Sequence, residues 1–263
     1  MLSRINAAIK SGDAPKRAVH FVYGKLLFSL PPNWRLQMYK GQDKFCPVCG
    51  SNLKGFLSLY RPYHQWCPVC KSLARHRFVW LFFSSPYSPI LTTSQKMLHI
   101  APEPALQEKF QALPNMSYVS GDLYNKKAMV KMDICNIQCP DQNFDLIYCS
   151  HVLEHVPSDR QALAEFRRVL KDDGAMVIMV PILGEHNFED PAITDPAERE
   201  RVYGQHDHVR LYGNNFPEVL EQAGFTVQSF VPTEFADPDE IIHMGLDEND
   251  IVFLCRKSAS DCA

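Results

Sequence analysis

The sequence contains no apolar run long enough to cross a membrane. Its longest uninterrupted apolar stretch is Phe78 to Phe83, whereas a membrane-spanning helix needs about 18 to 20 such residues. The N-terminus also lacks the apolar core and the small-residue cleavage site of a secretory signal peptide. We therefore expect a cytoplasmic protein.

A strong net charge is missing as well. The formal net charge is -3, which argues against a surface built mainly to neutralise phosphates. With 46% hydrophobic and 22% charged residues, the composition excludes a disordered or coiled-coil chain and indicates a globular protein. The charge is uneven, because residues 1 to 44 contain eight Lys or Arg and only Asp13 and Asp43.

Within this basic segment, residues 18 to 28 place apolar side chains at helical spacing between basic neighbours. Pro31 and Pro32 would end such a helix. Two interpretations remain open: a helix packed on its own domain, or a membrane-surface helix that gives residues 1 to 40 a peripheral membrane contact.

The nine cysteines are an odd number, so they cannot all pair with one another. Four form C-x2-C-x17-C-x2-C within residues 45 to 77, and this spacing predicts a structural Zn2+ ribbon. The expected metal ligands are Cys46, Cys49, Cys67 and Cys70. A redox dithiol would need one motif only. Arg75, His76 and Arg77 follow, as a solvated helix start or as an anion contact.

After a linking helix and loop at residues 78 to 95, the pattern alternates between strands and helices, which predicts an α/β domain with a parallel sheet. The expected strands cover residues 97–100, 118–120, 144–149, 175–180, 225–230 and 251–254, with a short third strand closing at Asp133 and Ile134. The expected helices cover residues 104–113, 159–171 and 216–223, with Gly174 ending the second.

Several segments carry a resemblance to a known family. They are Leu98 to Glu103, Ser120-Gly121-Asp122, Asp133-Ile134-Cys135, Phe144 to His155 and Arg167 to Gly174. In this order they resemble the class I S-adenosylmethionine-dependent methyltransferases, and most closely the bacterial type 11 group. The resemblance covers roughly residues 96 to 256, within an expected methyltransferase domain at residues 96 to 263. The resemblance implies a Rossmann-like seven-stranded sheet whose last strand is antiparallel. The cysteine segment is similar to zinc ribbons of some bacterial members, including a ribosomal RNA methyltransferase.

The resemblance also implies a cofactor site for S-adenosyl-L-methionine. Its expected residues are His99, Ala101, Glu103, Asp122, Leu123, Asp133, Ile134 and Ser150. Asp122 would bind the ribose diol, and Asp133 with Ile134 would bracket the adenine. The loop after the first strand lacks the family's glycines, so we expect Glu103 to take the cofactor's ammonium group instead.

Histidines supply the candidate catalytic groups. His151 begins the segment His151-Val152-Leu153-Glu154-His155, which also has the spacing of an inverted zinc-peptidase motif. The long connection from Gly184 to Tyr212 contributes His206 and His208 as candidate bases. Its candidate substrate-binding residues are Asp207, Arg210 and Tyr212. The alternative is a surface loop whose histidines only cap or bridge.

The sequence therefore predicts methyl transfer from S-adenosylmethionine to a hydroxyl of a small-molecule or glycan acceptor. An RNA or ribosomal methyltransferase that uses its ribbon and basic segment to hold nucleic acid is the first alternative. A catalytically inactive zinc-ribbon adaptor is the second, and its motivation is the glycine-poor loop at residues 101 to 105.

Overall fold

The computed structural model describes residues 14–59, 65–85 and 95–258, and the chain divides into two compact units. The smaller unit contains residues 1–82 and 235–247, and the larger contains residues 83–234 and 248–263. Residues 1–13 of the basic segment and Cys262 lie outside the described residues. Within the described part, no helix is long and apolar enough to span a membrane.

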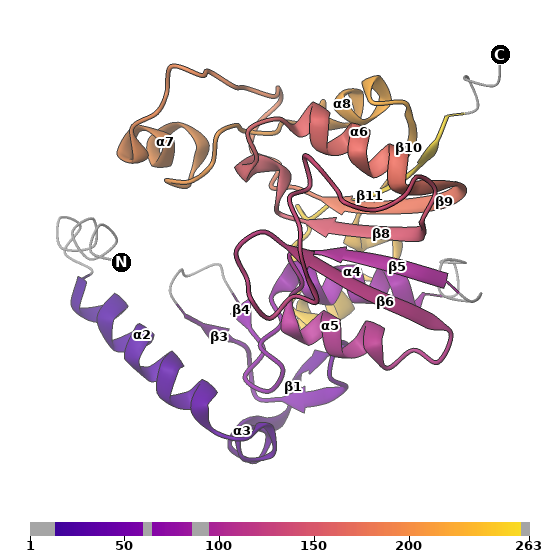
Figure 1. Cartoon of the computed structure of the whole chain (residues 1–263). Coiled ribbons are helices and arrows are strands. Elements are labelled where there is room, and N and C mark those ends of the chain that lie inside the picture. Colours follow the sequence, from indigo (N-terminus) through magenta and orange to yellow (C-terminus); the bar gives the residue numbers. More distant parts are fainter. Residues whose placement is uncertain (1–13, 60–64, 86–94, 259–263) are drawn as a thin grey trace. The chain divides into compact units, whose positions relative to one another are not determined.

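Apart from one long helix, the smaller unit consists of short elements (Figure 1). Its helices are α2 (Ala14–Ser29), α3 (Pro32–Tyr39), most of α4 (Ala74–Ser84) and α9 (Pro238–Met244). Its strands form two antiparallel pairs, β1 (Lys40–Cys46) with β2 (Ser51–Leu53) and β3 (Leu57–Ser58) with β4 (Gln65–Trp66). The helix expected at residues 18 to 28 is confirmed by α2, which ends before the two prolines.

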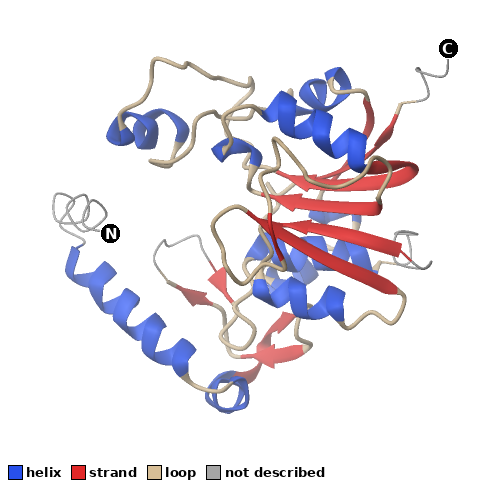
Figure 2. Cartoon of the chain, in the orientation of Figure 1, coloured by secondary structure: helices blue, strands red, loops and turns tan. Residues whose placement is uncertain are grey.

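The larger unit is built on one seven-stranded sheet (Figure 2). Its order is β10 (Phe225–Phe230), β11 (Val252–Lys257), β9 (Leu170–Met179), β8 (Phe144–Ser150), β5 (Gln95–Ile100), β6 (Met116–Asp122) and β7 (Val130–Lys131). Only β11 runs in the opposite direction to the other strands of this sheet. This order and the antiparallel last strand confirm the expected methyltransferase sheet.

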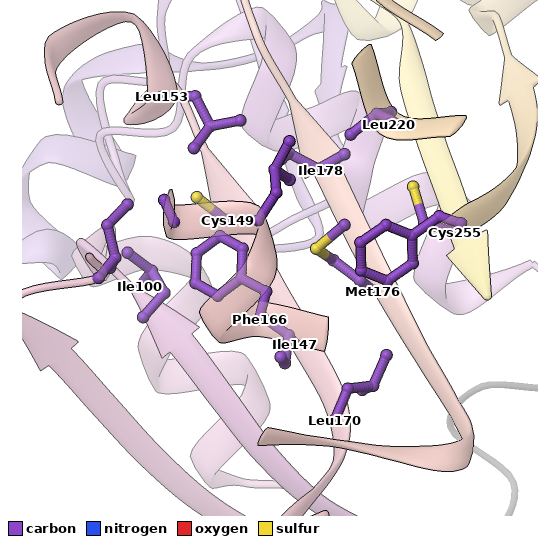
Figure 3. Packing of buried hydrophobic residues seen from close by; sticks show 14 of the residues in the cluster. Ile100, Ile147, Cys149, Leu153, Phe166, Leu170, Met176, Ile178, Leu220 and Cys255 are labelled. Carbon is purple, nitrogen blue, oxygen red and sulfur yellow. The ribbon is translucent and has the colours of Figure 1, made fainter. Parts of the chain in front are cut away.

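Side chains of successive strand residues point to opposite faces of this sheet, and they are buried on both. Leu98 and Ile100 belong to a core cluster with residues of α6 (Asp159–Val169) and α8 (Phe216–Gln222). Figure 3 shows Cys149 and Cys255 packed among the side chains of this cluster. On the other face, α5 (Pro104–Gln111) places Phe110 against His99 of β5 and Tyr148 of β8.

Two expected element boundaries are wrong. The third strand, β7, ends before Asp133, because the Asp133 carboxylate accepts a hydrogen bond from Cys135 N at 2.9 Å and the chain turns there. The helix expected through residue 171 ends at Val169, and Gly174 lies inside β9. A Cβ at Gly174 would lie 3.0 Å from the Asp145 carbonyl oxygen, so this glycine permits a close backbone approach.

Candidate methyltransferase site and metal centre

The carboxyl ends of β5, β6 and β8 meet at one edge of the sheet, because these three strands are adjacent and parallel. Ala101 directly follows β5, while Asp122 and Ser150 end β6 and β8. The Ala101 N–H donates to the Gly121 carbonyl at 2.8 Å, and Ala101 has a φ of +48°. Open α/β sheets bind their ligands at this edge, so the fold gathers the principal predicted cofactor residues there.

The two predicted cofactor residues of the first loop, His99 and Glu103, are joined to each other. His99 is fully buried, with Nε2 2.8 Å from Glu103 Oε2 and Nδ1 2.9 Å from the Tyr118 hydroxyl. Tyr148 donates to the other Glu103 oxygen at 3.5 Å. Glu103 is 14% exposed, so its carboxylate is held at the strand end by both neighbouring strands.

The Asp122 carboxylate fits the expected ribose contact. Its Oδ1 accepts the backbone N–H groups of Tyr124 and Asn125, both at 2.7 Å. Among the described residues no donor reaches Oδ2. Leu123 follows Asp122 and is half-buried. One carboxylate oxygen therefore orders the turn while the other remains for a hydroxyl ligand.

The remaining cofactor candidates differ in burial. Ile134 is buried and Asp133 is exposed, on the turn that follows β7. The Ser150 hydroxyl is buried and has no hydrogen-bond partner in the described part of the chain. This hydroxyl lies at the same edge of the sheet as the Asp122 carboxylate. A buried hydroxyl normally has a hydrogen-bond partner, and a bound polar molecule could provide one. The residues present therefore fit S-adenosylmethionine.

His151 occupies the turn after β8 in a left-handed conformation, with a φ of +55°. Its N–H donates to the Met179 carbonyl at 2.9 Å, which ties the turn to β9. The imidazole is 25% exposed, and its Nδ1 lies 3.4 Å from Glu154 Oε1. His151 is therefore partly accessible beside Ser150, and a buried carboxylate lies next to it.

Glu154 is a functional candidate that the sequence reasoning did not select. Its side chain is 1% exposed and lies in a short 3-10 turn, η2 (Leu153–His155). Burial opposes ionisation, but His151 and His155 lower the pKa of this carboxyl below its ordinary value. The only available signal was its spacing of three residues from His151. Because η2 is a single 3-10 turn, the motif lacks the helix that the peptidase interpretation requires.

The three loop residues His206, Asp207 and His208 occupy different environments. His206 is 39% exposed, with Nδ1 3.8 Å from Asp207 Oδ1. His208 is buried, its Nδ1 lies 3.1 Å from the Tyr203 carbonyl, and burial lowers its pKa. The connection is also more regular than expected, because α7 (Pro196–Tyr203) lies within it.

Arg210 is buried and holds the turn after β8. Its guanidinium donates to both Glu189 oxygens at 2.9 and 3.2 Å. It also donates to the carbonyls of Leu153, Val156 and Pro157 at 2.6, 2.6 and 3.2 Å. A guanidinium has five N–H donors, and all are used, so a substrate contact by Arg210 would require one of these bonds to break.

Tyr212 is buried and donates to Asp159 Oδ2 at 2.8 Å. Burial, together with the Asp159 carboxylate, raises the pKa of Tyr212, which keeps the hydroxyl neutral. Tyr212 and Arg210 line a pocket of about 600 Å³ with Phe188 and Glu189. None of the predicted catalytic histidines lines this pocket, so it is separate from the histidine group.

The four predicted metal ligands come together in the smaller unit. Cys46 Sγ lies 3.7 Å from Cys70 Sγ, and Cys49 Sγ lies 3.8 Å from Cys67 Sγ. All four sulfur atoms lie within 4.8 Å of one another. With Zn–S bonds of about 2.3 Å, a tetrahedral site has sulfur atoms about 3.8 Å apart, so the thiol group fits Zn2+.

Arg77, in the basic cluster after the second cysteine pair, is neither solvated nor available to an anion. Its side chain is fully buried. Its guanidinium donates to the carbonyls of Gln65, Ser72, Met244 and Gly245 at distances between 2.6 and 3.0 Å. Arg77 therefore joins residues 235–247 to the cysteine-containing part of the smaller unit.

Comparisons with known proteins agree with this geometry. Residues 92–178 match a family model described as a methyltransferase domain. An uncharacterised 37.1 kDa protein in transposon TN4556 of Streptomyces fradiae is 32% identical over 106 residues. That match covers 38% of this chain and 29% of that protein.

Two solved structures illustrate the structural similarity. One is a SAM-dependent methyltransferase from Archaeoglobus fulgidus, with 16% identity and a TM-score of 0.47, covering 70% of this chain and 94% of that one. The other is the Burkholderia thailandensis 1,6-didemethyltoxoflavin-N1-methyltransferase, with 16% identity and a TM-score of 0.45, covering 64% and 73%. From the family match and the strand order, we conclude that residues 92–178 belong to a class I S-adenosylmethionine-dependent methyltransferase domain of the type 11 group.

Proposed function

We propose that the protein transfers a methyl group from S-adenosylmethionine to a hydroxyl of a small-molecule or glycan acceptor. The observation that carries this proposal is the position of His151. It directly follows Ser150 at the sheet edge where the predicted cofactor residues gather, and it is partly exposed. An imidazole in this place is suited to removing the proton of an acceptor hydroxyl.

The partner of His151 supports this role. The Nδ1 atom faces Glu154 at 3.4 Å, and we assign Nε2 to the acceptor. A carboxylate on one ring nitrogen orients the imidazole and favours its protonated form after proton transfer. The left-handed turn, held to β9 through Met179, keeps the ring at the strand end.

S-adenosylmethionine, when bound, would supply a methyl group whose carbon an acceptor oxygen can attack in line, with the thioether S-adenosylhomocysteine as the leaving group. The protein has to hold and align the two molecules. Asp122 offers one oxygen to the ribose, and Ile134 offers an apolar surface to the base. Glu103 remains our prediction for the ammonium contact, with its carboxylate held by His99 and Tyr148.

Cofactor binding can be measured without knowing the acceptor. Asp122→Asn keeps an acceptor for the Tyr124 and Asn125 N–H groups but replaces the second oxygen by an amide donor. We expect calorimetry to show binding weakened about 10- to 100-fold, the value of a hydrogen bond to a charged group. Glu185→Gln, on an exposed loop residue, should bind like the wild type. Equal affinity of Asp122→Asn would contradict the ribose contact.

The acceptor class is tested with methyl-labelled S-adenosylmethionine and two probes, a low-molecular-weight cell extract and total RNA. Label in a base-stable small product supports the proposal, whereas label in RNA overturns it in favour of the nucleic-acid alternative. No transfer to either fraction, with no cofactor binding, would support the adaptor.

The proton acceptor is tested on the labelled small product. His151→Ala should lower kcat about 10²- to 10⁴-fold, the usual contribution of a general base, and leave the cofactor affinity unchanged. His186→Ala, an exposed histidine of the long loop, is the matched control. A larger loss of kcat in His206→Ala than in His151→Ala would assign the proton transfer to the loop.

We also propose a peripheral membrane contact through the two N-terminal helices, which suits a lipid-linked acceptor. In α2, Val22 and Leu26 are 54% and 64% exposed, and in α3, Trp34 and Met38 are 67% and 51% exposed. Each pair is four residues apart, so each helix presents an apolar face. Residues 1–13 lie outside the described part.

Vesicle sedimentation tests this contact. The full-length protein should sediment with vesicles containing anionic lipid, and Leu26→Asp with Trp34→Ser should abolish sedimentation. Tyr124→Ser, at an 87% exposed aromatic of the larger unit, is the control. Unchanged sedimentation of the double variant would rule out this contact.

A further inference from the structure

Glu154 is a buried carboxylate without the hydrogen bonds that burial normally demands. Its side chain is 1% exposed, and neither oxygen accepts a hydrogen bond within the described residues. The ion pair with His151, at 3.4 Å, engages Oε1 only. Because a buried charge is costly unless it is paired or bound to a metal, this carboxylate indicates that a further positive charge belongs beside it.

Two histidines surround the same carboxylate. One ligand atom each from Glu154, His155 and His208 lie within 4.8 Å of one another. The His155 and His208 rings meet edge to face, with centroids 4.7 Å apart and an angle of 86°. The residues come from two segments, η2 and the loop after α7, and the Val209 N–H joins the segments by donating to the Glu154 carbonyl at 2.9 Å.

The Nδ1 atom of each histidine is already held by an acceptor. His208 Nδ1 lies 3.1 Å from the Tyr203 carbonyl oxygen. His155 Nδ1 lies 3.3 Å from the Asp207 carbonyl oxygen and 3.6 Å from Asp207 Oδ2. A carbonyl can only accept, so Nδ1 carries the proton and Nε2 keeps its lone pair. Metal-binding histidines are oriented in this way by carbonyl or carboxylate groups.

From these contacts we propose that Glu154, His155 and His208 form a second metal site, which binds a divalent transition metal and is best matched by Zn2+. Zinc accepts two histidines and one carboxylate at about 2.0 to 2.2 Å and leaves a fourth position for a solvent or substrate oxygen. Ligand atoms are then about 3.3 Å apart, so the group contracts modestly around the ion. The carboxylate has two oxygens and can face His151 and the metal together.

The site goes beyond the proposed methyl transfer and does not depend on it. The metal supplies a further positive charge beside Glu154, and it links the turn after β8 to the loop that contains His206. The competing explanation is a proton, with one of the neighbouring histidines charged. The two explanations differ in metal content, which is measured without S-adenosylmethionine or an acceptor.

Metal content of the full-length protein tests the site. After saturation with Zn2+ and desalting, mass spectrometry of the metal should give two zinc ions per chain, one for each cluster. His208→Gln and Glu154→Gln should each retain one. His206→Gln and His186→Gln change a half-buried and an exposed histidine that are not ligands, and both should retain two. One zinc ion in the wild type, or two in the ligand variants, would overturn the proposal.

A second measurement covers ligand variants that fold poorly. In the wild type, Co2+ replacing Zn2+ should give the absorption of a thiolate site together with a weaker band of a site with nitrogen and oxygen ligands. The Cys49→Ser variant should lose the thiolate absorption and keep the weaker band. Absence of the weaker band in both proteins would identify a proton, and not a metal, as the partner of Glu154.

Discussion

Two non-glycine residues hold left-handed backbone conformations at the ends of neighbouring strands. Ala101 follows β5 with a φ of +48°, and His151 follows β8 with a φ of +55°. A side chain in this region costs about 1 to 2 kcal/mol, and such strain concentrates at functional sites. At position 101 this chain holds a left-handed turn with alanine, where the resemblance leads one to expect glycine.

Replacing Ala101 by glycine should therefore stabilise the protein. The relief of about 1 to 2 kcal/mol is partly offset by the greater freedom of glycine in the unfolded chain, about 0.5 to 1 kcal/mol. We expect denaturant unfolding to show that the free energy of unfolding of Ala101→Gly is about 0.5 to 1 kcal/mol higher than that of the wild type. Ala105→Gly, within α5, should lower it by a similar amount. A loss of stability in Ala101→Gly would show that the Ala101 methyl group packs favourably.

At the scale of elements, Asp145 joins three strands at the end of the sheet opposite the candidate site. Its carboxylate accepts the Lys96 N–H of β5 at 2.7 Å and pairs with Lys171 of β9 at 2.7 Å. Partial burial opposes ionisation, but Lys171 and the Lys96 N–H lower the pKa of Asp145 below its ordinary value. The carboxylate therefore stabilises the register of β5, β8 and β9.

This gives a pH dependence of defined sign. Because the folded pKa is depressed, the stabilisation is present above the unfolded value of about 3.9 and is lost as the pH falls through the folded pKa. Asp145→Asn should cost about 1 kcal/mol at pH 7, since Lys171 is half-exposed, and almost nothing well below pH 3.9. Urea unfolding at pH 7 and well below pH 3.9 measures the loss of stability in Asp145→Asn, with Glu185→Gln as the control. An equal cost at both pH values would contradict the charge argument.

The segment 235–247 is an element that joins the smaller unit from far along the chain. Phe235 packs against Phe78 and Phe82 of α4, with ring centroids 5.9 and 6.0 Å away. Arg77 donates to the carbonyls of Met244 and Gly245, and its guanidinium lies over the Phe56 ring at 3.9 Å. One buried side chain thus holds both ends of the unit's sequence together.

Substitution of Arg77 should be far more damaging than substitution of its neighbour Arg75. Arg77→Met leaves four carbonyl acceptors without their donor, and we expect a loss of at least about 3 kcal/mol. Arg75→Met removes a half-buried side chain whose Nε has no partner among the residues that the structure describes, so its loss should stay below about 1 kcal/mol. Unfolding of both variants in guanidinium chloride measures the two losses of stability. Similar losses would refute the role given to Arg77.

Much of this architecture could be predicted from local sequence patterns. The cysteine spacing identified all four sulfur atoms that meet, and the motif order identified the seven-stranded sheet. Glu154 could not be selected in this way, because its importance depends on His208, which lies 54 residues later. Arg210 looked like a substrate contact because a sequence does not show which carbonyls a guanidinium meets inside the fold. The same limit concealed the association of residues 235–247 with the cysteine-containing unit.

At the scale of the whole molecule, the two units should respond differently to metal removal. The smaller unit has little apolar core, and a structural zinc site supplies folding free energy directly. We expect Cys49→Ser or chelation to make residues 14–82 sensitive to trypsin and to abolish one transition in calorimetry. The seven-stranded unit should keep its own transition. Cys139→Ser, at a half-buried cysteine outside the cluster, should behave like the wild type, and full resistance of Cys49→Ser would contradict the zinc-dependent unit.

The return of residues 235–247 to the smaller unit has a consequence for biosynthesis. The ribosome makes the cysteine-containing segment first, but the carbonyl groups that accept from Arg77 at positions 244 and 245 emerge only after β5 to β10. Domains generally fold as units during translation, N-terminal first. Here the N-terminal unit is begun first and can be completed only after almost all of the methyltransferase sheet has left the ribosome.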